Sequence, residues 1–144
     1  MWQICRGAIF HGSAAAGREA ALGANLRAFA PAIIWAATVW IAGGLQSTTS
    51  LPSVPGLDKV AHFGMYGVLG FLLARGWLAA DWRGTWLLPV LIALLLGMAD
   101  ELRQRSVPGR SAEVADWVAD VAGAATGVFI AMRLARRGRI EDSA

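Results

Sequence analysis

The sequence has few charged residues for a chain of 144. Asp, Glu, Lys and Arg make up 16% of it, whereas 56% is hydrophobic and the mean hydropathy is +0.50. A soluble domain of this size needs more polar side chains to cover its surface. A bilayer removes that need, because apolar side chains can face lipid. The shortage of charge therefore argues against a soluble domain and favours a membrane protein with one domain by length.

Cysteine is almost absent as well. Cys5 is the single cysteine, so an intramolecular disulfide and a cysteine-based metal site are both excluded. The N-terminal region also lacks the apolar stretch of a cleavable signal peptide, since no such run separates Arg6 from Arg18. We therefore expect the first apolar helix to act as an uncleaved anchor.

Four apolar runs predict an all-α, polytopic membrane protein with a bundle of four transmembrane helices. Polar or Pro- and Gly-containing connections separate the runs, which are Ala28–Leu45, Asp58–Ala80, Thr85–Glu101 and Val114–Leu134. The third run is short for a hydrocarbon layer of about 30 Å, so its ends must reach into the interfaces. Pro31 lies near the start of the first run, where proline is tolerated, and Asp58 is placed to cap the second helix.

The basic residues predict the orientation. Nine of the 13 Lys and Arg residues lie in the N-terminal segment, at the second-to-third connection or in the C-terminal tail. The positive-inside rule then places both termini in the cytoplasm. We accordingly divide the chain into a cytoplasmic lead-in at 1–27 (partly disordered or an interfacial helix), a membrane domain at 28–134 and a basic cytoplasmic tail at 135–144. Because the arginines flank apolar runs, the pI of about 10.0 does not indicate nucleic-acid binding.

Polar side chains gather at the predicted outer level of the membrane. An ionisable group at a helix centre costs roughly 2.5–3.5 kcal/mol, so such groups indicate function. Helical spacing places Lys59, His62 and Tyr66 on one face and Asp116 and Asp120 on another. Asp120 lies about one turn, roughly 6 Å, deeper than Asp116. The predicted ligand-binding set is Asp58, Lys59, His62, Glu101, Gln104, Arg110, Asp116 and Asp120.

Each of these residues also has a structural interpretation. Asp58 and Asp116 could cap helices, and His62 could be an interfacial histidine with its hydrogen bonds satisfied. Asp120 needs a partner, for which Lys59 or Arg110 lie at the right level, or else it stays protonated. Arg103 and Arg105 are expected to be solvated loop charges. The glycines at 64, 67, 70, 123 and 127 have the small-residue spacing of close helix packing. Convergence from three helices favours a functional site over a salt-bridge network.

The chain resembles the VanZ-like family at three motifs. They are "DKVAHFGMYGVLGFLL" (58–73), "ADELRQ" (99–104) and "PGRSAEVADWVADVAGAATG" (108–127). The resemblance implies a four-helix integral protein of the bacterial inner membrane, and the founding members are linked to resistance to glycopeptide antibiotics such as teicoplanin. The family commonly has Asn where this chain has Asp120. The last motif is also similar to membrane lipid phosphatases, with Arg110 and Asp120 in matching positions but Asp116 in place of their nucleophilic His.

Three functions remain open. In the first, Arg110 and Lys59 hold the phosphate or carboxylate of a membrane lipid or lipid-linked cell-wall precursor. In the second, the protein is a lipid hydrolase or transferase whose catalytic candidates are His62, Glu101 and Asp116. In the third, it is a structural helper or transporter that forms a homo-oligomer. No cofactor and no metal site is assigned, although Glu101, Asp116 and Asp120 offer carboxylates to a divalent cation.

Overall fold

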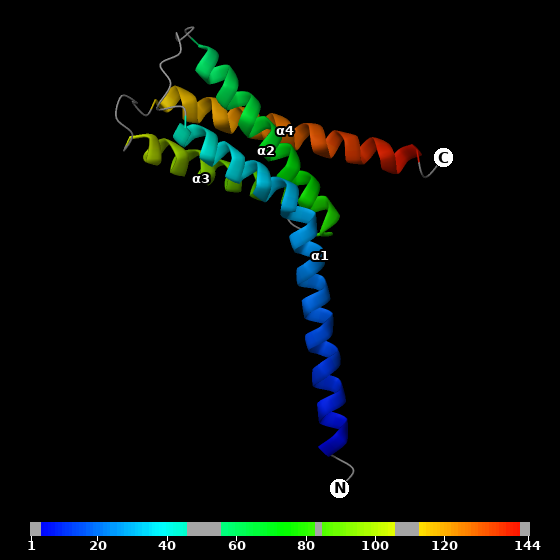
Figure 1. Ribbon diagram of the computed structural model, residues 1–144. Helices are drawn as coiled ribbons and strands as arrows, with labels where there is room; N and C mark the ends of the chain where they lie inside the picture. The colour runs from blue at the N-terminus through cyan, green and yellow to red at the C-terminus, as the bar shows by residue number, and fades with distance from the viewer. Residues whose placement is uncertain (1–3, 46–55, 83–84, 106–112, 142–144) are drawn as a thin grey trace.

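The computed structural model describes residues 4–45, 56–82, 85–105 and 113–141, with side chains described for 15–43, 56–82, 85–103, 105 and 113–140. The described residues form four helices: α1 (Ile4–Leu45), α2 (Leu57–Ala79), α3 (Leu87–Gln104) and α4 (Val114–Glu141). The predicted all-α class is therefore confirmed. Figure 1 shows α2, α3, α4 and the C-terminal part of α1 lying together as a bundle, while the N-terminal part of α1 extends away from it.

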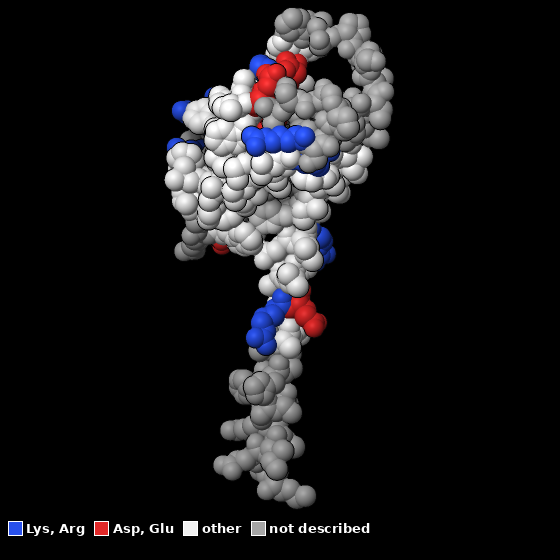
Figure 2. Space-filling model, turned by 90° about the vertical axis from the view of Figure 1, so that its left-hand side faces the viewer, with Lys and Arg blue, Asp and Glu red and all other residues white. Residues whose placement is uncertain are grey.

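Three of the helices are long and apolar enough to cross a membrane, which supports a multi-pass membrane protein. These segments are Ala15–Gly43, Leu57–Ala79 and Val114–Ile140. The fourth predicted span, α3, is not among these three segments. It has 18 residues and carries Asp100, Glu101 and Arg103 near its end. Large apolar side chains such as Ile34 and Phe129 are exposed. Figure 2 shows uncharged side chains covering much of the flank of the bundle.

Helix α1 differs from the sequence-based expectation. It is one helix of 42 residues that passes through the boundary expected at Arg27, and Pro31 lies inside it instead of near its start. Alanine is abundant before Arg27 and has the highest intrinsic helix propensity, which explains the longer helix. Proline lacks an N–H and clashes with the preceding turn, so it bends a helix. Figure 1 shows the corresponding change of direction between the two parts of α1.

Glycines bring α2 and α4 into close contact. A Cβ added at Gly127 would overlap the Gly67 carbonyl oxygen, and one added at Gly123 would overlap the Phe63 carbonyl oxygen. The packing role predicted for the glycines is thus confirmed at these positions, whereas Gly64 has no neighbouring atom within 4 Å of such a Cβ. These glycines allow two helices of the same chain to pack closely, so their spacing is not evidence for association between copies.

The helix ends set the positions of the polar residues. Gly56, with φ of 84°, is the N-cap of α2, so the prediction that Asp58 caps this helix is wrong. Asp81 adopts φ of 49° after α2. The N–H of Asp81 donates to the Leu78 carbonyl and that of Trp82 to the Trp77 carbonyl, which is a Schellman C-cap. At the start of α4 the Glu113 carbonyl accepts from Asp116 and Trp117, so Asp116 is not the capping residue either.

Candidate functional site

Polar side chains are buried at the end of the bundle where α2 and α4 begin and α3 ends. Their exposed fractions are 7% or less, and the set is His62, Asp100, Glu101, Asp116 and Asp120. Ionised side chains are almost never fully buried unless something compensates for the lost water. The contacts of each member therefore indicate what this end of the bundle is built to do.

His62 and Asp120 form a buried pair between α2 and α4. His62 Nδ1 lies 2.9 Å from Asp120 Oδ1, and the two side chains are 5% and 1% exposed. The prediction that Lys59 or Arg110 is the partner of Asp120 is wrong for Lys59, which has other partners, while Arg110 lies outside the described residues. Gly97 makes room for Asp120, because a Cβ there would lie 3.0 Å from Asp120 Oδ2.

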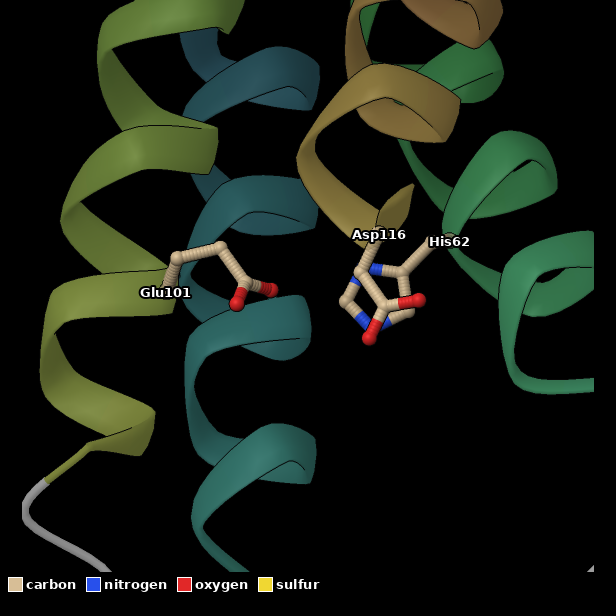
Figure 3. A group of neighbouring side chains, drawn as sticks. All are labelled: His62, Glu101 and Asp116. Carbon is tan, nitrogen blue, oxygen red and sulfur yellow. The ribbon is translucent and has the colours of Figure 1, made fainter. Parts of the chain in front are cut away.

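Three side chains, one from each of three helices, lie close together. His62 on α2, Glu101 on α3 and Asp116 on α4 each offer a ligand atom within 4.8 Å of the other two. Figure 3 shows the carboxylate of Glu101 directed toward His62 and Asp116. Both oxygens of Glu101 are buried, and neither has a hydrogen-bond partner among the described residues. A buried carboxylate left in that state costs at least about 1–3 kcal/mol.

Lys59 lies at the surface of this end of the bundle and is surrounded by carboxylates. Its Nζ is 2.9 Å from Asp58, 2.9 Å from Glu113 and 3.1 Å from Asp116. This ammonium already faces three acidic partners, and the expectation that Lys59 holds a phosphate or carboxylate of the ligand stays a prediction. Glu113 is not among the site residues predicted from the sequence. It lies in the polar connection before α4, and a sequence does not show where the side chains of such a connection point.

Asp100 and Arg103 form a third polar contact, on the side of α3 that faces α1. The Arg103 Nη2 is 2.7 Å from Asp100 Oδ1, and the guanidinium lies 4.9 Å from the centre of the Trp40 ring. The prediction that Arg103 is a solvated loop charge is wrong. The sequence signal for this pair is its i, i+3 spacing, which places Asp100 and Arg103 on one face of a helix.

The structure thus brings together most of the residues predicted from sequence. His62, Glu101, Asp116 and Asp120 are close and buried, and Asp58 and Lys59 lie beside them at the surface. Gln104 ends α3, but its side chain is outside the described set, as is the whole of Arg110. The roles of all these residues in ligand binding or catalysis stay predictions.

Acidic groups outnumber basic ones among the described residues of this end. Asp58, Glu101, Glu113, Asp116 and Asp120 face Lys59 and His62. Such an arrangement suits a ligand that brings positive charge or hydrogen-bond donors. It can also orient an imidazole for proton transfer, because a carboxylate on one ring nitrogen fixes the tautomer.

A groove of about 190 Å³ lies elsewhere, along the second half of α4. Apolar side chains predominate in its lining, to which Arg133 and Arg136 also contribute. None of the buried polar residues contributes to it. Its composition suits packing against an acyl chain more than binding a polar group, so we place the candidate site at the buried polar cluster.

Comparisons with known proteins give one match. A family model described as VanZ/LLP1 matches residues 9–136. This range covers α2, α3, the first 23 residues of α4 and nearly all of α1. No curated protein and no solved structure matches the chain.

Proposed function

Because the chain belongs to the VanZ/LLP1 family, we propose that it binds the headgroup of a lipid-linked cell-envelope precursor or other membrane lipid at the polar end of its helix bundle. The observation that carries this proposal is Glu101, whose two carboxylate oxygens are buried and have no hydrogen-bond partner among the described residues. A headgroup that donates hydrogen bonds to Glu101 would compensate for its burial.

The polar residues extend inward from the surface, which suits a headgroup that enters from the membrane interface. Asp58, Lys59 and Glu113 are at least partly exposed at the surface, whereas Asp116 and the His62–Asp120 pair are buried. Hydroxyl and amine groups of a sugar or peptide headgroup could bind along this series as donors. Arg110, six residues before Asp116, is the proposed contact for a phosphate.

The proposed arrangement has four spans: the three helices named above and α3. Both termini lie in the cytoplasm of a bacterial cell, and the polar end of the bundle lies outside. At about 1.5 Å per residue, the 18 residues of α3 extend roughly 27 Å. That length is close to the hydrocarbon thickness of about 30 Å. The concentration of arginine after residue 132 supports a cytoplasmic C-terminus.

The test is the identity of the lipid that purifies with the protein. Full-length protein is extracted in lipid nanodiscs, and its bound lipids are quantified by mass spectrometry for wild type, Glu101→Gln and Arg110→Ala. We expect one lipid class to be enriched in wild type and reduced about tenfold in both variants, which corresponds to about 1.4 kcal/mol. Asp81→Asn and Arg105→Ala are matched controls on exposed residues. An identical lipid profile in all five proteins would contradict the proposal.

A second candidate function is hydrolysis of a membrane lipid. The observation that favours it is the His62–Asp120 pair at 2.9 Å, in which the carboxylate would orient the imidazole as a general base. Release of phosphate from phosphatidyl or undecaprenyl substrates by the purified protein, and its loss in His62→Gln, would favour the enzyme over the binding protein.

Family membership also motivates a proposal about drug resistance. If the bound headgroup belongs to the cell wall, expression of this chain in a susceptible bacterium should raise the teicoplanin concentration needed to stop growth, and Glu101→Gln should not. An unchanged susceptibility with both proteins would separate this member from glycopeptide resistance without affecting headgroup binding.

A further inference from the structure

From the geometry we infer that His62, Glu101 and Asp116 form a binding site for one divalent transition-metal ion. The three side chains come from α2, α3 and α4, and all are buried. This inference goes beyond headgroup binding, because the three residues would hold the ion with no lipid present.

The distances suit a metal ion. Two ligand atoms that each lie about 2.0–2.2 Å from an ion can be at most about 4.4 Å apart. The ligand atoms of His62, Glu101 and Asp116 lie within 4.8 Å of one another. Small side-chain rotations therefore bring all three into contact with one ion, and no helix has to move.

Glu101 supplies a second and independent observation. Its side chain is directed at the other two residues (Figure 3), its residue is 7% exposed, and neither carboxylate oxygen has a hydrogen-bond partner among the described residues. A bound ion would satisfy one or both oxygens and remove the cost of the burial.

Asp120 prepares His62 for metal binding. With Asp120 ionised, the imidazole must donate its Nδ1–H to Oδ1 across the 2.9 Å contact. The lone pair of the neutral ring is then on Nε2, which becomes the ligand atom. A carboxylate that orients a metal-bound histidine in this way is the usual outer partner of such ligands.

The nearby acidic group of Asp58, Glu113 and Asp116 provides a contrast. Its ligand atoms are also within 4.8 Å of one another, but Lys59 Nζ lies 3.1 Å or less from all three residues. That group already has its cation. Lys59 Nζ lies 3.1 Å from Oδ1 of Asp116, and an ion bound to this carboxylate would use the other oxygen.

The donor set indicates the class of ion. An imidazole is a typical ligand of Zn²⁺ and of iron, and carboxylates suit Mn²⁺, whereas Mg²⁺ and Ca²⁺ prefer oxygen alone. Two carboxylates and a neutral imidazole also balance the charge of a divalent ion, which favours burial. Three protein ligands leave a coordination position open. A bound ion would thus bring to this acidic end the positive charge that a phosphate requires.

The test measures metal binding by the full-length protein, with its affinity tag removed. The protein in detergent is treated with a chelator, equilibrated with Zn²⁺ or Mn²⁺ alone and analysed by inductively coupled plasma mass spectrometry; Mn²⁺ binding is also followed by electron paramagnetic resonance. We expect about one ion per chain in wild type and in the control Asp81→Asn. Glu101→Gln should weaken binding at least about 10–100-fold, the range observed for loss of an outer-shell partner.

Wild-type protein that binds neither ion above the level of a buffer blank would overturn the inference, whether or not any variant folds. So would a Glu101→Gln protein that retains wild-type affinity and elutes as wild type. The lipid measurement described above is separate: a protein that binds Zn²⁺ but no specific lipid would contradict the proposed function and leave the metal site intact.

Discussion

His62 on α2 and Asp120 on α4 face each other across the tightest helix contact of the bundle, with Nδ1 and Oδ1 2.9 Å apart. The glycines at 67, 123 and 127 allow the two backbones to approach. The same contact therefore packs the helices and aligns an imidazole with a carboxylate. Substitutions of Asp120 should separate these two consequences.

We predict that Asp120→Ala destabilises the protein by about 3–5 kcal/mol, whereas Asp120→Asn costs less than about half of that. Removal of one partner from a buried pair leaves the other without compensation. The amide of asparagine keeps an oxygen that can accept the His62 Nδ1–H. Thermal unfolding in detergent, followed by the fluorescence of the seven tryptophans, measures the difference. Equal losses for Ala and Asn would show that the hydrogen bond is not what stabilises this pair.

We predict opposite effects of the same substitution at two glycines. Gly127→Ala places a methyl group against the Gly67 carbonyl and within 2.8 Å of the Phe71 nitrogen, where backbone atoms cannot give way. It should lower the free energy of unfolding by about 1–3 kcal/mol, the usual cost of overpacking. Gly64→Ala meets no atom within 4 Å. It should be neutral or stabilise α2 by up to about 1 kcal/mol through helix propensity. A Gly127→Ala protein as stable as Gly64→Ala would contradict the α2–α4 packing.

The candidate site could be predicted in part from the sequence because polar residues are rare in this chain. The spacings of His62, Asp116 and Asp120, together with the level of Glu101, were enough to place four side chains near one another. Their pairing was not predictable. It depends on the rotation of α4 against α2, and glycine spacing indicates that a helix packs closely without indicating which helix is its partner. The sequence therefore suggested Lys59 or Arg110 for Asp120, where the structure has His62.

The fold was predictable to the same degree. Apolar runs identified four helices, but hydropathy does not indicate where a helix ends in the aqueous region. Alanine-rich sequence continues α1 back to Ile4, and the arginine-rich residues after 132 continue α4 to Glu141. Alanine, leucine and arginine are frequent in both extensions and have good helix propensity, although the bilayer does not require these segments to be helical. Arg103 was misassigned for a related reason, since the connection after α3 begins later than the charges suggested.

We predict that Arg103→Ala is more destabilising than Arg105→Ala. Arg103 faces the buried carboxylate of Asp100 at 2.7 Å and covers the Trp40 ring, whereas Arg105 is exposed. Loss of the Arg103 guanidinium should cost about 3 kcal/mol, as for other broken buried pairs, and loss of Arg105 less than about 0.5 kcal/mol. Thermal unfolding of the two variants under identical conditions makes the comparison. If both lose the same small amount, the contact between α1 and α3 does not depend on this ion pair.

We predict that the connection before α4 is labelled from outside the cell and the C-terminus only from inside. The single cysteine makes the experiment direct, because Cys5→Ser gives a background without thiols. In that background Ser111→Cys should react with a membrane-impermeant maleimide in intact spheroplasts, and Ser143→Cys only after permeabilisation. The reason is electrostatic: arginines concentrate after residue 132 and the positive-inside rule retains them in the cytoplasm. The acidic surface around Lys59 and Glu113 would then face the outside, where lipid-linked precursors are displayed. Labelling in the reverse order would place the buried polar cluster at the cytoplasmic face, and a headgroup ligand would have to be sought there instead.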